Sequence, residues 1–141
     1  MRKHAGMSGE RNLELLLQNM KPEMKDGVFV YCTVADNMDI PGTIRPVFIF
    51  HEREGTTLVV RREEAEHIGL PYQFPSRLIT LTVHSSLDAI GFLAAITARL
   101  SQSGISANAV SAFYHDHLFV PHDRAEEALR HLKELSGPDA E

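Results

Sequence analysis

The sequence has a single cysteine among its 141 residues, Cys32, which excludes an internal disulfide framework. No apolar run approaches the roughly 20 residues that a membrane-spanning helix needs. No apolar run of signal-peptide length follows the basic N-terminus. The net charge is −5 at pH 7, and the clustered basic face of a nucleic-acid-binding protein is absent. These absences predict a cytoplasmic protein with neither nucleic acid nor membrane as a partner.

Motifs of nucleophilic catalysis and of phosphate binding are also missing. The sequence has no G-x-S-x-G elbow and neither glycine pattern that cradles phosphates, G-x-x-x-x-G-K-[ST] or G-x-G-x-x-G. Cys32 lies in the apolar run VFVYCTV and is expected to be a small buried side chain. A Cys/His pair formed with His51 stays open, because sequence spacing does not decide whether the two residues meet. We therefore expect no enzymatic activity, no catalytic residues and no cofactor.

What is present is the pattern of a small α+β protein. Hydrophobic residues make up 43% and charged residues 23% of the chain, which suits one compact domain or two small ones that share a core. The ends, 1–8 and 137–141, are expected to be loose. Periodicity predicts helices over 13–20, 62–70, 89–102 and 123–135, strands over 27–34, 46–52, 56–60, 77–84, 105–114 and 117–121, and a proline-containing linker over 71–76.

The chain also contains a degenerate internal repeat. TLVVRREEAEHIGL (57–70) can be laid over HLFVPHDRAEEALR (117–130) at a constant offset of 60, so that Leu58 meets Leu118 and Ala65 meets Ala125. The pattern predicts two ferredoxin-like repeats, with antiparallel sheets and helices on one face. We place the repeats at 9–72 and 77–136.

The triplet His115-Asp116-His117 resembles a metal-binding motif. At the offset of 60, however, Tyr114-His115-Asp116 lies over Glu54-Gly55-Thr56, where the glycine indicates a tight hairpin turn. We therefore expect His115-Asp116 to be a hairpin turn, with His115 and His117 on opposite sides of it and no metal site.

HSSLDAIGFLAAI (84–96) is the feature most typical of ligand binding. A strand ends here, Ser85 and Asp88 spell a capping box, and Gly91 lies in the expected first turn of the helix. The unpaired N–H groups of a helix N-terminus can bind a carboxylate or another small anion.

In this stretch the sequence resembles the ACT domain, a regulatory ferredoxin-like module that binds amino acids and similar small metabolites. Asp88-Ala89-Ile90-Gly91 stands at the position of the family's D-x-P-G motif, and Gly104 to Asn108 lies near its G-I-N-I motif. The whole chain is similar to small stand-alone tandem-ACT proteins, which share EGTTLVV, HSSLDAIGF and HDHLFVP in this order. The resemblance implies two ACT-like repeats and no attached enzyme.

The resemblance also implies a ligand site at the junction of the two repeats. Its expected residues are Ser85, Ser86, Leu87, Asp88, Ala89, Ile90 and Gly91, with Asn108 on the adjacent strand and Glu54 on the opposite wall. The N–H groups near Ser86–Ala89 would hold the ligand carboxylate, and Asp88 would either cap the helix or meet an amino group.

Two alternatives to a small-molecule sensor stay open. The first is a protein interaction module without ligand, and a homodimer is possible because ACT-like sheets often associate side by side. The second is a metal-dependent enzyme that uses His84, His115 and His117.

Overall fold

The computed structural model describes residues 9–137, so the prediction of loose ends, apart from Gly137, lies outside the described residues. In order, its elements are α1 (Leu13–Asn19), β1 (Pro22–Met24), β2 (Phe29–Val34), β3 (Phe48–Glu52), β4 (Gly55–Arg61), α2 (Arg62–His67), β5 (Gln73–Leu81), α3 (Phe92–Gln102), β6 (Asn108–Ser111), β7 (Asp116–Pro121), a 3-10 turn (His122–Arg124) and α4 (Ala125–Ser136). Within the described part, no helix is long and apolar enough to cross a membrane.

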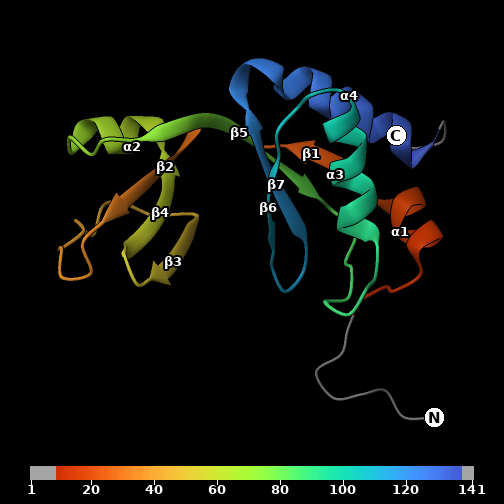
Figure 1. The fold of residues 1–141 in the computed structure, drawn as a ribbon, viewed down its shortest axis with the longest axis horizontal. Coiled ribbons are helices and arrows are strands. Elements are labelled where there is room, and N and C mark those ends of the chain that lie inside the picture. Colours follow the sequence, from red (N-terminus) through yellow and green to blue (C-terminus); the bar gives the residue numbers. More distant parts are fainter. Residues whose placement is uncertain (1–8, 138–141) are drawn as a thin grey trace, which may run out of the picture.

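The strands form one antiparallel sheet of seven strands in the order β3-β4-β2-β5-β7-β6, with β1 also paired to β5 (Figure 1). The helices pack on one face of this sheet, as the α+β prediction requires. Leu58 and Val60 lie in one apolar cluster with Ala65 of α2. Leu118 and Val120 lie in another, which includes residues of α4. The other face carries Phe29, Val59 and Phe119 in a separate apolar cluster that joins both halves.

The long strand β5 belongs to both halves of the molecule. Its first residues pair with β2, where Ser76 lies opposite Phe29, and its last residues pair with β1, where Leu81 lies opposite Pro22. The strand orders β5-β2-β4-β3 and β1-β5-β7-β6 therefore repeat one four-stranded arrangement. We call the first set the N-terminal unit and the second, with α1, α3 and α4, the C-terminal unit.

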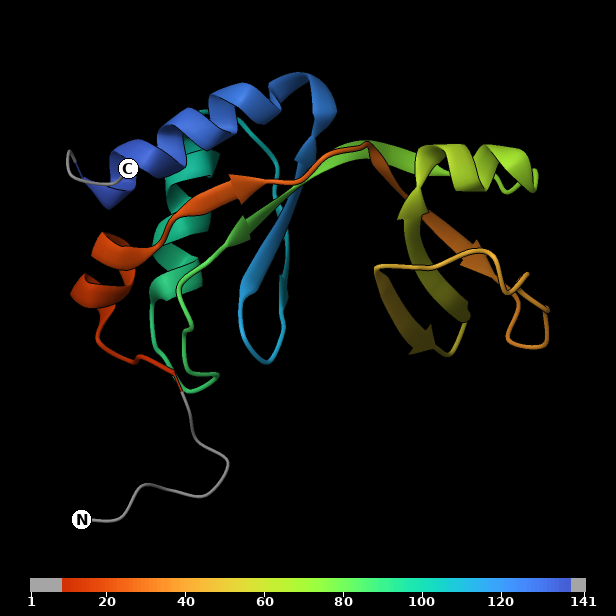
Figure 2. The same ribbon diagram turned by 180° about the vertical axis from the view of Figure 1, so that it is seen from behind.

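The final strand of each unit is supplied within this chain. β5 completes the N-terminal unit, and β1 completes the C-terminal unit from a distant part of the sequence. Leu16 and Met20 are buried in one core with residues of α3 and α4, and Figure 2 shows α1 beside the helices of the C-terminal unit. The segment before residue 25, assigned by sequence to the first repeat, thus packs in the second unit.

Three local predictions are wrong. Residues 73–76, expected in a linker, are strand, and the break signalled by Pro75 appears as an irregularity in the β2–β5 register beside Phe74, whose φ is 59°. The third helix begins at Phe92, after Gly91 with φ 90°, so Ser85 and Asp88 form no capping box. The strand expected over 105–114 is confined to Asn108–Ser111.

The predicted hairpin near His115-Asp116 is present, between β6 and β7, but its turn does not lie at the predicted residues. Glu52 pairs with Gly55 across the β3–β4 turn, whereas Ser111 pairs with Asp116 at the end of β6–β7. The second turn therefore lies at 112–115, closed by the Ala112 N–H donating to the His115 carbonyl over 3.0 Å. Asp116 is the first residue of β7 and lies outside the turn.

Candidate functional site

The loop between β5 and α3 is held in place by the N-terminal segment. The Glu10 N–H donates to the His84 carbonyl and the Ser86 N–H donates to the Glu10 carbonyl, each over 2.8 Å. A Cβ atom on Gly9 would lie 2.7 Å from the Ser85 carbonyl carbon, so only glycine permits this approach. The loop is therefore fixed by a contact between segments far apart in the sequence.

Most of the amides first expected to bind a carboxylate have acceptors inside the protein. The Ser86 N–H is used by Glu10, the Asp88 N–H donates to the Ser86 hydroxyl over 3.1 Å, and the Ala89 N–H donates to the Ser86 carbonyl over 2.9 Å. The available donors are instead the N–H groups of Phe92, Leu93 and Ala94, which lie in the first turn of α3, where a helix offers no internal acceptor. No side chain caps this terminus.

These first-turn residues line a small pocket of about 140 Å³, which we call the α3 pocket. Asp116, a residue that is 6% exposed, also lines this pocket. The Ser85 hydroxyl donates to Asp116 Oδ2 over 2.9 Å. The complete lining is Ser85, Ser86, Leu87, Ala89, Gly91, Phe92, Leu93, Ala94, Ser111 and Asp116.

The structure brings together five of the nine residues expected at the site: Ser85, Ser86, Leu87, Ala89 and Gly91. Asp88 and Ile90 are exposed and do not line the α3 pocket, and neither do Asn108 and Glu54. Sequence reasoning missed the acid of the pocket, Asp116. The available signal was its alternation with Leu118 and Val120, which places its side chain on the helix side of β7.

The His115-Asp116-His117 triplet is divided between the two faces of the sheet. Asp116 faces the α3 pocket, while the rings of His115 and His117 lie on the other side with centroids 6.4 Å apart. The prediction that the two histidines lie on opposite sides of a turn is wrong, because the turn ends at His115 and the two rings lie near each other where β7 begins.

His117 is partly buried. Its Nδ1 lies 2.9 Å from the Thr80 hydroxyl. Burial, reinforced by the charge of His115, lowers the pKa of His117 below its usual value; Asp116 opposes this shift and Lys25 adds to it. The neutral imidazole is therefore the form that the fold favours.

Acidification is expected to destabilise the protein through His117. Because its pKa is lower in the folded than in the unfolded chain, the unfolded chain takes up its proton first as the pH falls below about 6.5. The stabilisation is fully present above that pH and is lost as the pH falls through the folded pKa. Thermal unfolding between about pH 7.5 and pH 5 should show this loss, and His117→Gln should reduce it.

The matched control for this measurement is His122→Gln, at an exposed position in the 3-10 turn. It should retain the pH dependence of the wild type. An equal pH dependence in His117→Gln and the wild type would show that His117 is not the group responsible.

The described residues contain no group of three or more histidines, cysteines or acids placed to hold a metal ion. The His84 ring lies against Tyr114 and Phe113, with centroids 5.3 and 6.4 Å away. Cys32 is buried, as expected, and burial raises the pKa of its thiol. His51 Nδ1 lies 3.2 Å from the Thr56 hydroxyl.

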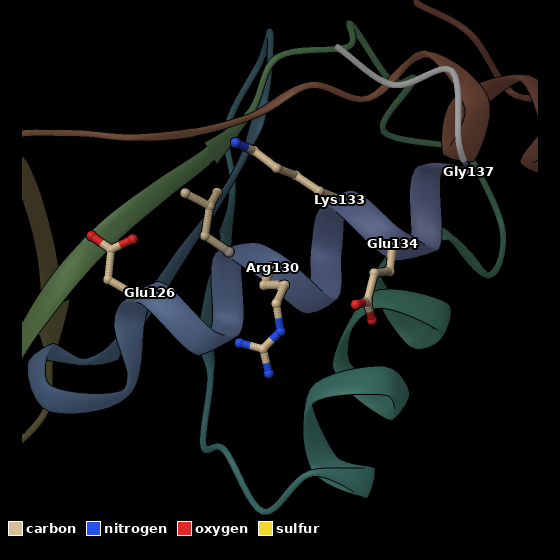
Figure 3. Close-up of a pocket in the computed structure, with 6 residues that line it drawn as sticks. Glu126, Arg130, Lys133, Glu134 and Gly137 are labelled. Atoms are coloured by element: carbon tan, nitrogen blue, oxygen red, sulfur yellow. The ribbon is translucent and has the colours of Figure 1, made fainter.

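A larger hollow of about 560 Å³ runs along the outer side of α4 (Figure 3). Its lining carries both signs of charge, and Lys133 and Arg130 extend to different sides of the helix. Glu134 forms an ion pair with Arg99 of α3. With no polar groups converging on one point, this hollow lacks the arrangement of a specific small-molecule site.

The two units that share β5 define a tandem ferredoxin-like module. Two family models described as ACT domain match residues 8–77 and 73–134, and together they span most of the sequence. The chain belongs to the ACT domain family. A comparison with curated protein sequences finds no match.

Solved structures agree with this assignment. A Vibrio cholerae protein of unknown function, described as a possible transport protein, is 44% identical, with a TM-score of 0.80 over 92% of this chain and 99% of that one. An Agrobacterium tumefaciens protein is 19% identical, with a TM-score of 0.71 over 83% of this chain and 89% of that one. The regulatory subunit of aspartate kinase from Thermus thermophilus shares the fold at 12% identity, with a TM-score of 0.61 over 84% of this chain and 97% of that subunit.

Proposed function

We propose that this protein is a stand-alone sensor module that binds a small amino acid, or a similar zwitterionic metabolite, in the α3 pocket. One observation carries the proposal: the pocket combines the first-turn amides of α3 with the buried carboxylate of Asp116. Backbone N–H groups at a helix N-terminus suit a ligand carboxylate, and a buried carboxylate suits a ligand ammonium group.

The size and lining of the pocket narrow the class of ligand. A volume of about 140 Å³ is below the range of pockets for drug-sized molecules, which begins at about 300 Å³. Leu87, Phe92 and Leu93 contribute apolar surface beside the polar groups. We therefore favour an amino acid with a short or modest apolar side chain over a charged one.

We further propose that the module acts by binding and not by catalysis, without a cofactor and in the cytoplasm. The likeness to a regulatory subunit of aspartate kinase supports a regulatory role through the shared fold. In the α3 pocket the Ser85 hydroxyl donates to Asp116, and neither a histidine nor a cysteine is among the residues that line it.

A homodimer with its interface at the pocket mouth is the second part of the proposal. Leu87 is 66% exposed and Ile90 is 84% exposed beside the pocket. Phe113 and Tyr114 are also exposed, in the turn between Ser111 and Asp116, which both line the pocket. Exposed apolar groups gathered at one place are typical of an interaction surface. Light scattering with and without amino acid tests this part, and a monomer under both conditions would contradict it.

Thermal-shift screening against the common amino acids tests the ligand proposal directly. Each amino acid that stabilises the protein is then compared with its amide, which lacks the carboxylate, and with its N-acetyl form, which lacks the ammonium group. We expect stabilisation by the zwitterion alone. The proposal would be contradicted if no amino acid stabilised the protein at a concentration about 100 times a typical micromolar Kd. Equal stabilisation by the amide and N-acetyl forms would also contradict it.

Ala94→Glu is expected to weaken amino-acid binding about tenfold or more without loss of stability. Ala94 is exposed at the third position of α3, where a glutamate can bond the free amides of the helix start. Its carboxylate would compete with the ligand carboxylate for those donors. Titration calorimetry measures the affinity, and thermal unfolding measures the stability.

Ala98→Glu is the matched control, because Ala98 is an exposed alanine one turn further along α3 and does not line the pocket. It adds the same charge and should bind amino acid like the wild type. Equal weakening by both variants would assign the effect to net charge and contradict the role of the first-turn amides.

A further inference from the structure

A second concave site lies on the face of the sheet opposite the helices. This inter-unit cleft has a volume of about 270 Å³. Val47 and Phe48 line it from the N-terminal unit, Leu78 from the shared strand, and Val110, His117 and Phe119 from the C-terminal unit. Figure 2 shows the β3–β4 and β6–β7 hairpins extending from the sheet in the same general direction, with the helices α2 and α4 on the other side.

The cleft is separate from the α3 pocket. The two share no lining residue, because Asp116 and His117 point to opposite faces of β7. Phe48, Leu78 and Val110 pack against the cluster formed by Phe29, Val59 and Phe119. The walls of the cleft are therefore apolar and built on the strands of both units.

His117 provides the one ionisable group among the residues that line the cleft. Its Nδ1 is engaged by Thr80. Within residues 9–137 the only buried and unpaired side-chain nitrogen or oxygen is Nε of Arg77. The unbonded Nε2 of His117 is therefore accessible and available to a ligand.

The charges around this end of the cleft favour an anionic group. Lys25 is a positive neighbour of His117, as His115 is when protonated, and the acid that opposes them, Asp116, faces away from the cleft. Glu23 is also nearby, but its carboxylate is paired with Lys25 Nζ at 2.8 Å. An ammonium group would meet like charges here, with no free carboxylate among the lining residues.

We propose that the inter-unit cleft binds a small monocarboxylate with an aryl or branched alkyl body. The carboxylate accepts a hydrogen bond from Nε2 of His117, and the apolar body lies between Phe48 and Phe119. The carboxylate also stabilises the protonated imidazole, so binding draws a proton onto His117. This ligand class differs from the zwitterion of the α3 pocket, because the cleft has nothing to bind an ammonium group.

Phenylacetate and phenylacetamide are the matched probes, since they share the ring and differ in charge. Nuclear magnetic resonance of the His117 ring protons, with phenylacetate titrated at about pH 6.5 and at about pH 8, reports both binding and protonation. We expect binding of phenylacetate at least about tenfold tighter than that of the amide, as for a hydrogen bond to a charged group. We also expect a rise in the pKa of His117 when phenylacetate binds.

Two variants test the location of the site. Ala112→Trp, at an exposed position that lines the cleft, should block it, and His117→Gln should remove the preference for the carboxylate. Asp88→Asn, at an exposed position that lines neither the cleft nor the α3 pocket, should leave phenylacetate binding unchanged. Equal binding of acid and amide, a His117 pKa unmoved by phenylacetate, or full binding by Ala112→Trp would each overturn the proposal.

Discussion

Replacing Asp116 by asparagine is expected to weaken amino-acid binding by about thirtyfold or more, with little change in stability. Asp116 is the buried carboxylate of the α3 pocket, at 6% exposure. Removing one partner of a buried, hydrogen-bonded charge pair costs about 2–5 kcal/mol, and about 1.4 kcal/mol is a tenfold change in affinity. Asparagine keeps the shape and an oxygen acceptor for the Ser85 hydroxyl, which now bonds Asp116 over 2.9 Å.

The matched control is Asp88→Asn, which makes the same chemical change at an exposed position in the loop between β5 and α3. Asp88 does not line the pocket, so this variant should bind amino acid within about twofold of the wild type, as expected for a screened surface charge. Titration calorimetry on both variants separates the two acids. A large loss in Asp88→Asn with none in Asp116→Asn would restore the sequence-based assignment and contradict the structural one.

The two-repeat fold could be predicted because its signal is local and repeated. At the offset of 60, Leu58 and Leu118 are both buried on the helix side of the sheet. Ala65 of α2 and Ala125 of α4 are both buried where these helices pack against it. Such positions follow from strand alternation and helix periodicity, which can be recognised within a short stretch of sequence. The family models and the ferredoxin-like arrangement confirm that part of the prediction.

The chemistry of the candidate site depends on contacts that no local pattern records. The Ser85–Asp116 hydrogen bond joins residues 31 positions apart. The Ser86 N–H, expected to be free for a ligand, donates to the carbonyl of Glu10 in the N-terminal segment. The serines and acid near 85–88 resemble a capping box, but the two serine hydroxyls bond other groups of the protein and the helix begins only at Phe92.

The triplet His115-Asp116-His117 shows the same limit in another form. Its turn assignment was displaced by only a few residues, yet in a strand a shift of one residue reverses the face of every side chain. With Asp116 as the first residue of β7, the acid belongs to the α3 pocket and His117 to the inter-unit cleft. Register, set here by pairing with β5 and β6, decides which residues can meet.

Leu16→Ala is expected to destabilise the C-terminal unit by about 3 kcal/mol, within the range for truncating a buried leucine. Leu16 has 0% exposure and lies in the core that also contains Ile96 of α3 and Leu132 of α4. A segment that belonged only to the N-terminal unit would give no such effect. Chemical denaturation followed by circular dichroism measures the change without needing tryptophan, which this sequence lacks.

Leu15→Ala is the matched control, since the neighbouring leucine on the same helix is 42% exposed and should cost within about 0.5 kcal/mol. Hydrogen exchange then shows how far the damage spreads. Because β5 belongs to both units and pairs with β1 and with β2, loss of the α1 contact should also lower protection in β2. Loss of protection confined to α1 would mean that the shared strand does not couple the units. Loss in both units would show that the stability of one unit is coupled to that of the other through β5.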